Sequence, residues 1–161
     1  MSPQNSGYMM AKKNTPESGN ENKIELGMLT DLLGYHLRRA QINTFRQFAN
    51  TFGKDRVTPT QLTIMILVEQ NPGISQVDVG RILDMDRATT MAIIDKLQDR
   101  QWLERRKSIQ DKRKHALHLT SKGNTALKEM KKEVMNIEKA FVSPLTADEK
   151  KQLLVLLKKL L

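Results

Sequence analysis

The clearest pattern of apolar and polar positions along the chain lies between residues 75 and 120. Ser75 is a good N-cap for a short helix, and its apolar positions are Val77, Val79, Ile82 and Leu83. A turn follows at residues 84–85, and Asp86 can cap a second helix. The apolar face of that helix falls at i, i+3, i+4 and i+7, at Thr90, Ile93, Ile94 and Leu97. Two short helices joined by a tight turn predict a helix-turn-helix.

Two short segments after the second helix, Leu103–Lys107 and His115–Leu119, predict an antiparallel hairpin. Between Glu104 and His115 only Glu104 and Asp111 are acidic, and the basic residues are Arg105, Arg106, Lys107, Lys112, Arg113 and Lys114. Taken alone, a charged hairpin is more often a solvated surface. Directly after a helix-turn-helix it favours a DNA-binding wing that reaches phosphates or a minor groove.

The segments on either side of this region predict further helices. Residues 1–22 are polar and are expected to form a disordered tail. Residues 24–53 predict one long helix with a stop at Gly53, and residues 58–61 have the composition of a helix start with a capping box. Thr120 can cap a helix whose apolar stripe is Leu127, Met130, Val134, Ile137 and Phe141. After a break at Ser143–Pro144, residues 146–149 predict a second capping box with Thr146 as N-cap, at the start of a leucine-rich final helix.

The first and last of these helices are too apolar for one small domain to cover. We therefore expect a second subunit to bury them, so that residues 24–53 and 121–161 form the dimerisation helices around a winged helix-turn-helix at 58–120. The alternative is that the first helix packs entirely within its own subunit.

Composition narrows the function. The 161 residues include 27 Lys and Arg against 18 Asp and Glu, a formal net charge of +9, which favours a polyanionic partner. No apolar run is long enough to span a membrane and no signal peptide is recognisable, so we expect a cytoplasmic protein. Cysteine is absent, and His36, His115 and His118 lack the spacing of metal ligands. We expect no cofactor and no metal. No constellation typical of an enzyme is recognisable.

Specific residues resemble the MarR family of bacterial transcriptional regulators. Asp111-Lys112-Arg113, followed by Leu119-Thr120 and Gly123, is similar to the family's wing signature, and Asp95-Lys96-Leu97 is similar to its recognition helix. Two positions depart from the family pattern: Ala92 stands where arginine is frequent, and Gln101 stands where glycine is usual. The resemblance implies a mainly α fold within residues 23–161, with a two-stranded wing, and a homodimer that binds double-stranded operator DNA.

We assign roles to individual side chains on this basis. Base reading is expected from the exposed face of the second helix, at Arg87, Thr89 and Ala92, the last two through small apolar contacts to thymine methyl groups. Ala88 on the same helix is also expected to contact DNA. Phosphate contacts are expected from Lys96, Arg105, Arg106, Lys107, Lys112 and Lys114, and from Ser75 and Gln76 at a helix N-terminus. Arg113 is expected to enter a minor groove, oriented by Asp111.

Residues 32–41, together with residues 86–89, resemble the branch of the family that controls breakdown of hydroxycinnamates and similar aromatic acids. This implies an aromatic acid or its coenzyme A thioester as effector. Tyr35, Arg38 and Arg39 stand at i, i+3 and i+4 beside His36, so one helix face can offer a ring and two guanidiniums to such a ligand. Alternatively, the two arginines pair with acidic residues at a dimer surface or touch the DNA backbone.

The resulting hypothesis is a ligand-released repressor of aromatic-acid catabolic genes that binds a pseudo-palindromic operator. Two other classes stay open: an architectural protein that binds DNA without sequence preference, and a membrane-surface or coiled-coil interaction protein.

Overall fold

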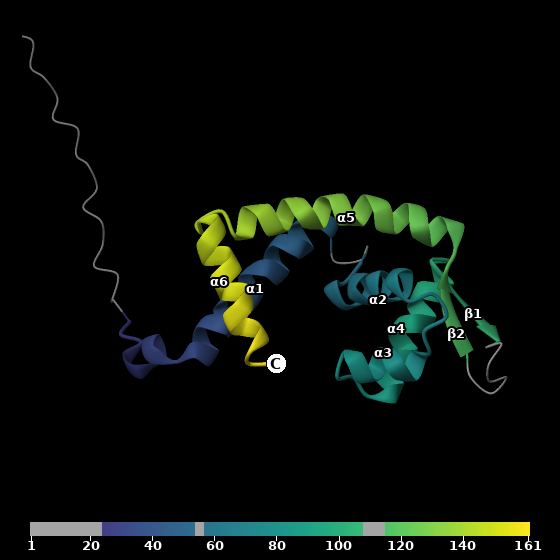
Figure 1. Cartoon of the computed structure of the whole chain (residues 1–161), viewed down its shortest axis with the longest axis horizontal. Coiled ribbons are helices and arrows are strands. Elements are labelled where there is room, and N and C mark those ends of the chain that lie inside the picture. The colour runs from purple at the N-terminus through teal and green to yellow at the C-terminus, as the bar shows by residue number, and fades with distance from the viewer. Residues whose placement is uncertain (1–23, 54–56, 108–114) are drawn as a thin grey trace, which may run out of the picture.

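The structure, a computed structural model, describes residues 24–53, 57–107 and 115–161. In chain order its elements are the 3-10 helix η1 (Gly27–Asp31), α1 (Leu33–Phe52), α2 (Pro59–Gln70), α3 (Gln76–Ile82), α4 (Arg87–Asp99), β1 (Leu103–Lys107), β2 (His115–Leu119), α5 (Ser121–Phe141) and α6 (Ala147–Lys158). The predicted fold class, mainly helical with a two-stranded wing, is confirmed. Figure 1 shows α5 as a long rod with α2, α3, α4 and the hairpin below one end, and with α6 at the other.

Short polar side chains set where the helices begin. All five N-caps expected from the sequence are present, and each accepts a hydrogen bond from the backbone N–H three residues later: Thr58, Ser75, Asp86, Thr120 and Thr146. Reciprocal capping boxes form at Thr58–Gln61 and Thr146–Glu149. Caps of this kind each stabilise a helix by about 1 kcal/mol.

One predicted element is wrong in its extent. The expected single helix over residues 24–53 is broken at Leu32, whose backbone is extended and separates η1 from α1. Gly27 at φ +52° is incompatible with a continuous α-helix. The His36 ring nitrogen Nε2 lies 2.7 Å from the Thr30 carbonyl oxygen and so bridges the break.

The core lies where α2, α3, α4, the hairpin and α5 meet. Its fully buried side chains include Ile64, Met65, Val79, Ile94, Leu97, Leu117 and Leu127. α2 supplies Leu62, Ile64, Met65 and Val68 to this core, because its apolar residues follow one another almost without interruption. The helix-turn-helix and its hairpin are therefore one packed unit.

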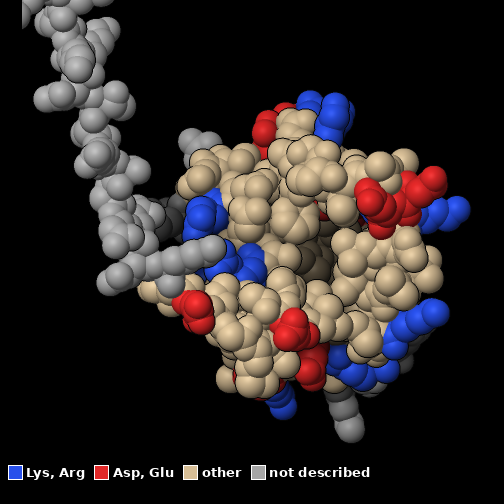
Figure 2. Space-filling model, turned by 90° about the vertical axis from the view of Figure 1, so that its left-hand side faces the viewer, with Lys and Arg blue, Asp and Glu red and all other residues tan. Residues whose placement is uncertain are grey.

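The other end of the molecule is much less covered. No residue of α6 is buried, and Leu154, Val155 and Leu156 are each about half exposed. α1 buries only Phe48 and Phe52, near its C-terminal end, while Leu33 and Phe45 are more than half exposed. Figure 2 looks onto this end of the molecule and shows broad areas of uncharged residues around a central hollow.

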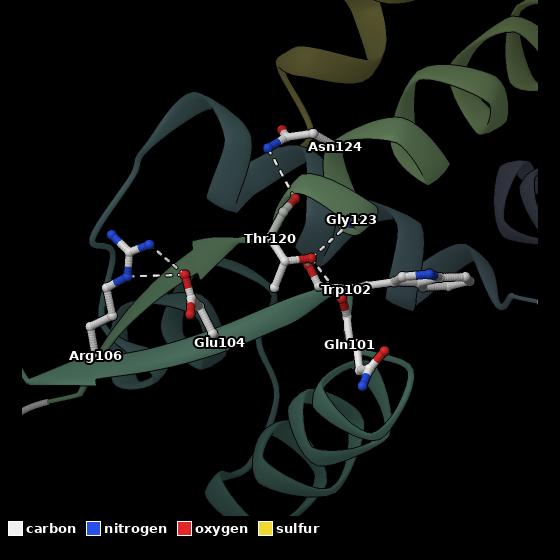
Figure 3. A network of polar contacts seen from close by, with 7 residues as sticks. All are labelled: Gln101, Trp102, Glu104, Arg106, Thr120, Gly123 and Asn124. Atoms are coloured by element: carbon white, nitrogen blue, oxygen red, sulfur yellow. Dashed lines mark hydrogen bonds and ion pairs between the residues drawn. The ribbon is translucent and has the colours of Figure 1, made fainter.

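At the junction between the hairpin and α5, Gly123 has the least space for a side chain of any glycine in the described residues. A Cβ at Gly123 would lie 2.0 Å from the carbonyl oxygen of Trp102, far inside contact distance. Figure 3 shows the same place, where the Thr120 hydroxyl donates to the Gln101 carbonyl at 2.6 Å and accepts from the Gly123 N–H at 2.9 Å.

Gly123→Ala is expected to destabilise the protein by about 1–3 kcal/mol, because the new methyl group forces α5 away from Trp102. Gly34→Ala is the matched control, since Gly34 is also helical but has nothing within 4 Å of its Cβ position. It is expected to be neutral or to stabilise by up to about 1 kcal/mol. Urea unfolding at one fixed protein concentration measures both, and equal effects of the two substitutions would contradict the packing argument.

Candidate nucleic-acid interface

The exposed face of α4 carries the side chains expected to read bases. Thr90, Ile94 and Leu97 are buried and Ile93 is half-buried, so the predicted inner face is confirmed. The opposite side leaves five of the predicted contacts exposed: Arg87, Ala88, Thr89, Ala92 and Lys96. α4 therefore offers solvent a surface of small side chains bordered by an arginine and a lysine.

The first turn of α4 is held by Asp86. Its carboxylate accepts the Thr89 hydroxyl at 2.6 Å and the Thr89 backbone N–H at 2.8 Å. These hydrogen bonds, the hydroxyl first, lower the pKa of Asp86, so the cap stays charged at neutral pH. Because the Thr89 hydroxyl proton is committed to Asp86, the methyl group of Thr89 is the part suited to an apolar base contact.

The first turn of α3 is already engaged within the protein. Ser75 Oγ donates to Asp78 Oδ2 at 2.7 Å and accepts from the Asp78 N–H at 3.1 Å. Gln76 Oε1 accepts from Arg105 Nε at 3.2 Å. The predicted phosphate contacts of Ser75 and Gln76 stay predictions, and in this arrangement their side chains also orient neighbouring residues.

Arg105 has a different setting from the one expected. Its guanidinium pairs with Asp95 Oδ1 at 2.6 Å, donates to Gln98 as well as Gln76, and leaves the side chain only 20% exposed. The remaining terminal nitrogen is buried and has no hydrogen-bond partner among the described residues. The guanidinium thus ties β1 to α3 and α4. Its expected phosphate contact stays a prediction.

The hairpin pairs antiparallel, with Leu103 opposite Leu119 and Lys107 opposite His115. Arg106 lies on its exposed side and donates from Nε to Glu104 at 3.0 Å, with its side chain 59% exposed (Figure 3). Lys107 is the last residue of β1. The predicted contacts at the tip lie outside the described residues, namely Asp111, Lys112, Arg113 and Lys114.

The end of α4 shows how the chain turns into the hairpin without a glycine. Gln101 adopts a left-handed conformation with φ +60°. The Gln101 N–H bonds the Gln98 carbonyl at 2.7 Å and the Trp102 N–H bonds the Leu97 carbonyl at 2.9 Å, which is the Schellman pattern. A left-handed non-glycine residue costs about 1–2 kcal/mol. These bonds, and the one from Thr120 to the Gln101 carbonyl, oppose that cost.

The residues expected to hold an effector lie on the exposed part of α1. The Arg39 guanidinium donates to the Tyr35 hydroxyl at 3.0 Å and lies 5.8 Å from the ring centroid, so these two side chains form a pair. His36 instead bonds the Thr30 carbonyl, which gives it a structural partner. Arg38 is exposed beside them.

A cavity of about 830 Å³, which the sequence gave no sign of, lies between the end of α1, the end of α4 and the first half of α5. Phe52, Val57, Trp102 and Met130 supply its apolar lining. Its charged lining residues are Arg100, Lys122, Glu129 and Glu133, and the Arg100 guanidinium lies 5.0 Å from the Trp102 ring centroid. The cavity thus offers an aromatic ring to a ligand, while its two cations and two carboxylates give the lining no overall preference for an anion.

Comparison with known proteins agrees with this architecture. The model of the MarR family matches residues 57–115. A "Putative transcriptional regulatory protein for hcr operon" from Thauera aromatica is 34% identical over 152 residues, which cover 92% of each chain. The chain belongs to the MarR family.

Solved structures give the same result for the fold of this MarR-family protein. The "Transcriptional repressor, CouR, bound to a 23-mer DNA duplex" is 33% identical with a TM-score of 0.81, covering 86% of this chain and 98% of that one. The same repressor bound to p-coumaroyl-CoA is 32% identical with a TM-score of 0.77, covering 86% and 97%. This protein is thus a DNA-binding transcriptional regulator of the MarR family. Among the described residues, no helix has the length and apolar character needed to cross a membrane.

Arg105 and Arg106 are neighbours, but the Arg105 side chain is 20% exposed and the Arg106 side chain is 59% exposed. Substituting each in turn distinguishes a residue that positions the hairpin from one that contacts a phosphate. Arg106→Ala is expected to reduce the salt dependence of DNA binding by about one unit of slope, because an exposed cation is lost. Arg105→Ala is expected to weaken DNA binding with the salt slope unchanged, because it loosens β1 from α3 and α4. Fluorescence anisotropy with one duplex at several salt concentrations measures both slopes. A reduced salt slope for Arg105→Ala would show that Arg105 does contact a phosphate.

Proposed function

We propose that this MarR-family regulator is a homodimeric repressor that binds a pseudo-palindromic operator and is released from it by an aromatic acid or its coenzyme A thioester. The observation that carries the proposal is the division of the molecule into two ends. One end presents α4 and a basic hairpin; we call this unit, α2 to β2 (residues 59–119), the reading head. At the other end α1 and α6 have exposed apolar side chains. Two copies of such a chain can associate through the apolar side chains of α1 and α6 and leave both reading heads free to bind DNA.

The exposed apolar side chains support the dimer. Leu33, Phe45, Leu154, Leu156 and Leu160 are each between 48% and 62% exposed in the single chain. A leucine removed from water contributes about 1.5–3 kcal/mol, so a surface of this kind is costly to leave uncovered. A second copy of the same chain provides a matching apolar surface through a two-fold axis.

Within each helix-turn-helix and hairpin we assign the DNA contacts by exposure on α4 and at Arg106, and by sequence position for Lys107 and the hairpin tip. Base reading comes from the side of α4 that carries Arg87, Ala88, Thr89 and Ala92. Phosphate contacts come from Lys96, Arg106, Lys107, Lys112 and Lys114. Arg113, with Asp111 beside it in the sequence, enters the minor groove. Arg105 positions the wing and is not assigned to a phosphate.

The operator test compares the DNA upstream of the protein's own gene with a random duplex of equal length at one salt concentration. The parent is expected to bind the upstream DNA at least about a thousandfold more tightly and to protect two half-sites about 34–36 Å apart. Deleting residues 153–161 removes the second half of α6 without removing a buried side chain. The truncated protein is expected to sediment as a monomer or aggregate and to lose tight binding.

A ratio near one for the parent would instead favour the architectural alternative, in which charge alone carries the affinity. A truncated chain that sediments as a dimer would place the dimer interface elsewhere. The two outcomes are independent, since the first concerns sequence preference and the second concerns α6.

The effector proposal rests on α1 and the cavity at its C-terminal end. Arg38 and Phe52 are fourteen residues apart, close to four helical turns, so they lie on about the same face and about 21 Å from each other along the axis. Phe52 lines the cavity with Trp102, and Arg38 is exposed. A thioester with its aromatic acyl group in the cavity can extend its phosphates toward Arg38 and the Tyr35–Arg39 pair.

Occupation of this site would change the separation of the two heads. The cavity is lined by residues of α1, which we place in the dimer interface, and by residues of α5, which connects that end to the reading head. It is also lined by Trp102 at the base of the hairpin. A ligand that binds more tightly to a state that does not fit the operator shifts the population toward that state. The similarity to CouR, whose structures include one with p-coumaroyl-CoA and one with DNA, supports the choice of ligand class.

The test titrates p-coumarate, ferulate and their coenzyme A thioesters against the operator complex. Trp102 is the single tryptophan of the chain, so its fluorescence reports directly on the cavity. We expect at least one ligand to quench Trp102 and to release DNA. Arg38→Ala is expected to weaken thioester binding by about 1.5–3 kcal/mol, as for a lost charged hydrogen bond.

Arg46→Ala is the matched control, because Arg46 is another exposed arginine of α1 and lies outside the cavity lining. It is expected to respond to every ligand like the parent. Release of DNA by none of the four ligands would overturn the ligand class. Release with no change in Trp102 fluorescence would overturn the cavity as the acyl site.

A further inference from the structure

A second, smaller cleft lies between α3 and α4 within the reading head. Its volume is about 300 Å³, and its apolar lining comes from Val77, Met85 and Met91. Val77 is 69% exposed and Met91 is 38% exposed, although each lies on a short helix of a basic DNA-binding unit. Apolar side chains exposed around a concave surface are typical of a binding site. None of these three residues was among the DNA contacts expected from the sequence.

The floor of this cleft offers no free hydroxyl proton to a ligand. Gly80 and Thr90 both line it, and a Cβ at Gly80 would lie 2.9 Å from Thr90 Oγ1, so the two helices meet closely there. Thr90 is 2% exposed and donates its hydroxyl proton to the Asp86 carbonyl at 2.8 Å. Because that donor is satisfied inside the protein, the cleft favours a small apolar group over a polar one.

The position of the cleft points to one occupant. It adjoins the exposed face of α4, the helix that a helix-turn-helix places in the major groove. Arg87 and Arg81 stand at its edge, where the Arg81 guanidinium is paired with Asp78 at 3.1 Å and Arg87 is exposed. A cationic edge suits the phosphates on either side of a base. The small apolar group that base edges present in the major groove is the 5-methyl group of thymine.

We propose that Val77 and Met91 are specificity-determining residues that read thymine in each half-site by enclosing its methyl group. This inference rests on the proposed operator binding and names the chemistry by which one or two positions are recognised. Transfer of one methyl group from water to an apolar surface accounts for about a fourfold difference in affinity. Selectivity at these positions then depends on burial of the methyl group and not on a hydrogen bond.

The test replaces each operator thymine in turn by deoxyuridine, which removes the methyl group and leaves the hydrogen-bonding edge intact. Binding is measured by anisotropy at constant salt for the full-length dimer. For the parent, replacement at one or two positions in each half-site is expected to weaken binding about fourfold. Met91→Ala and Val77→Ala are expected to weaken binding to the thymine operator and to abolish the difference between thymine and deoxyuridine at those positions.

Met135→Ala is the control, because Met135 is also an exposed methionine, 66% accessible, but lies on α5. It is expected to keep the parent's sensitivity to deoxyuridine. A parent that binds every substituted operator equally, or variants at both Val77 and Met91 that keep the sensitivity, would overturn the methyl-reading site while operator binding itself stands. A parent without preference for any duplex would overturn operator recognition, and this inference with it.

Discussion

The first turn of α5 packs against the main chain of Trp102 so closely that residue 123 has no room for a side-chain carbon. Thr120 fastens the same place by capping α5 and by donating its hydroxyl to the carbonyl of Gln101. The end of α4, the base of the hairpin and the start of α5 are therefore held as one rigid junction. Since α5 continues to the end of the molecule that carries α1 and α6, a shift of α5 would carry the helix-turn-helix and the hairpin with it.

Several basic side chains form ion pairs within the chain, among them Arg81, Arg105, Arg106 and Lys131. The net charge of +9 marks a polyanion-binding protein, yet several of its arginines and lysines already have acidic partners within the chain. Arg105 is paired with Asp95 and bonded to two glutamines, and its charge organises the head. The Lys131–Glu69 pair joins α5 to α2, and hydrogen bonding to Lys131 lowers the pKa of Glu69. The net charge alone therefore does not show which cations are accessible to a polyanion, because that depends on the exposure of each side chain.

The two ends of the molecule differ in how far their apolar side chains are buried. Around α2 and α4 the apolar faces close on one another, and Ile64, Met65, Ile94 and Leu97 lose contact with water completely. On α6 no residue is buried, and Leu153, Leu154 and Leu156 remain between 42% and 49% exposed. The cavity beside Trp102 lies between these two ends and is lined by residues of α1, of α5 and of the turn between α4 and β1. A ligand there would contact elements from both ends, which is the arrangement that coupling between effector and DNA requires.

The sequence by itself determined the local features. The N-caps at Thr58, Ser75, Asp86, Thr120 and Thr146, the inner face of α4 and the hairpin strands were all predicted correctly. Each depends on residues two to four positions apart, or on a short alternation, so spacing alone reveals it. The wing motif with Thr120 and Gly123 indicated the family, and the structure explains that spacing through the contact of α5 with Trp102.

Only the tertiary structure decided features that join distant segments. The partners of Arg105 come from positions 76, 95 and 98, so the direction of its guanidinium could not be read from a run of basic residues. The cavity beside Trp102 draws its walls from residues 51 to 133, and the cleft at Val77 and Met91 exists only because α3 and α4 cross at Gly80. The break at Leu32 likewise needed the bond from His36 to Thr30. Such contacts depend on how helices pack, and residue spacing along one helix carries no record of its neighbours.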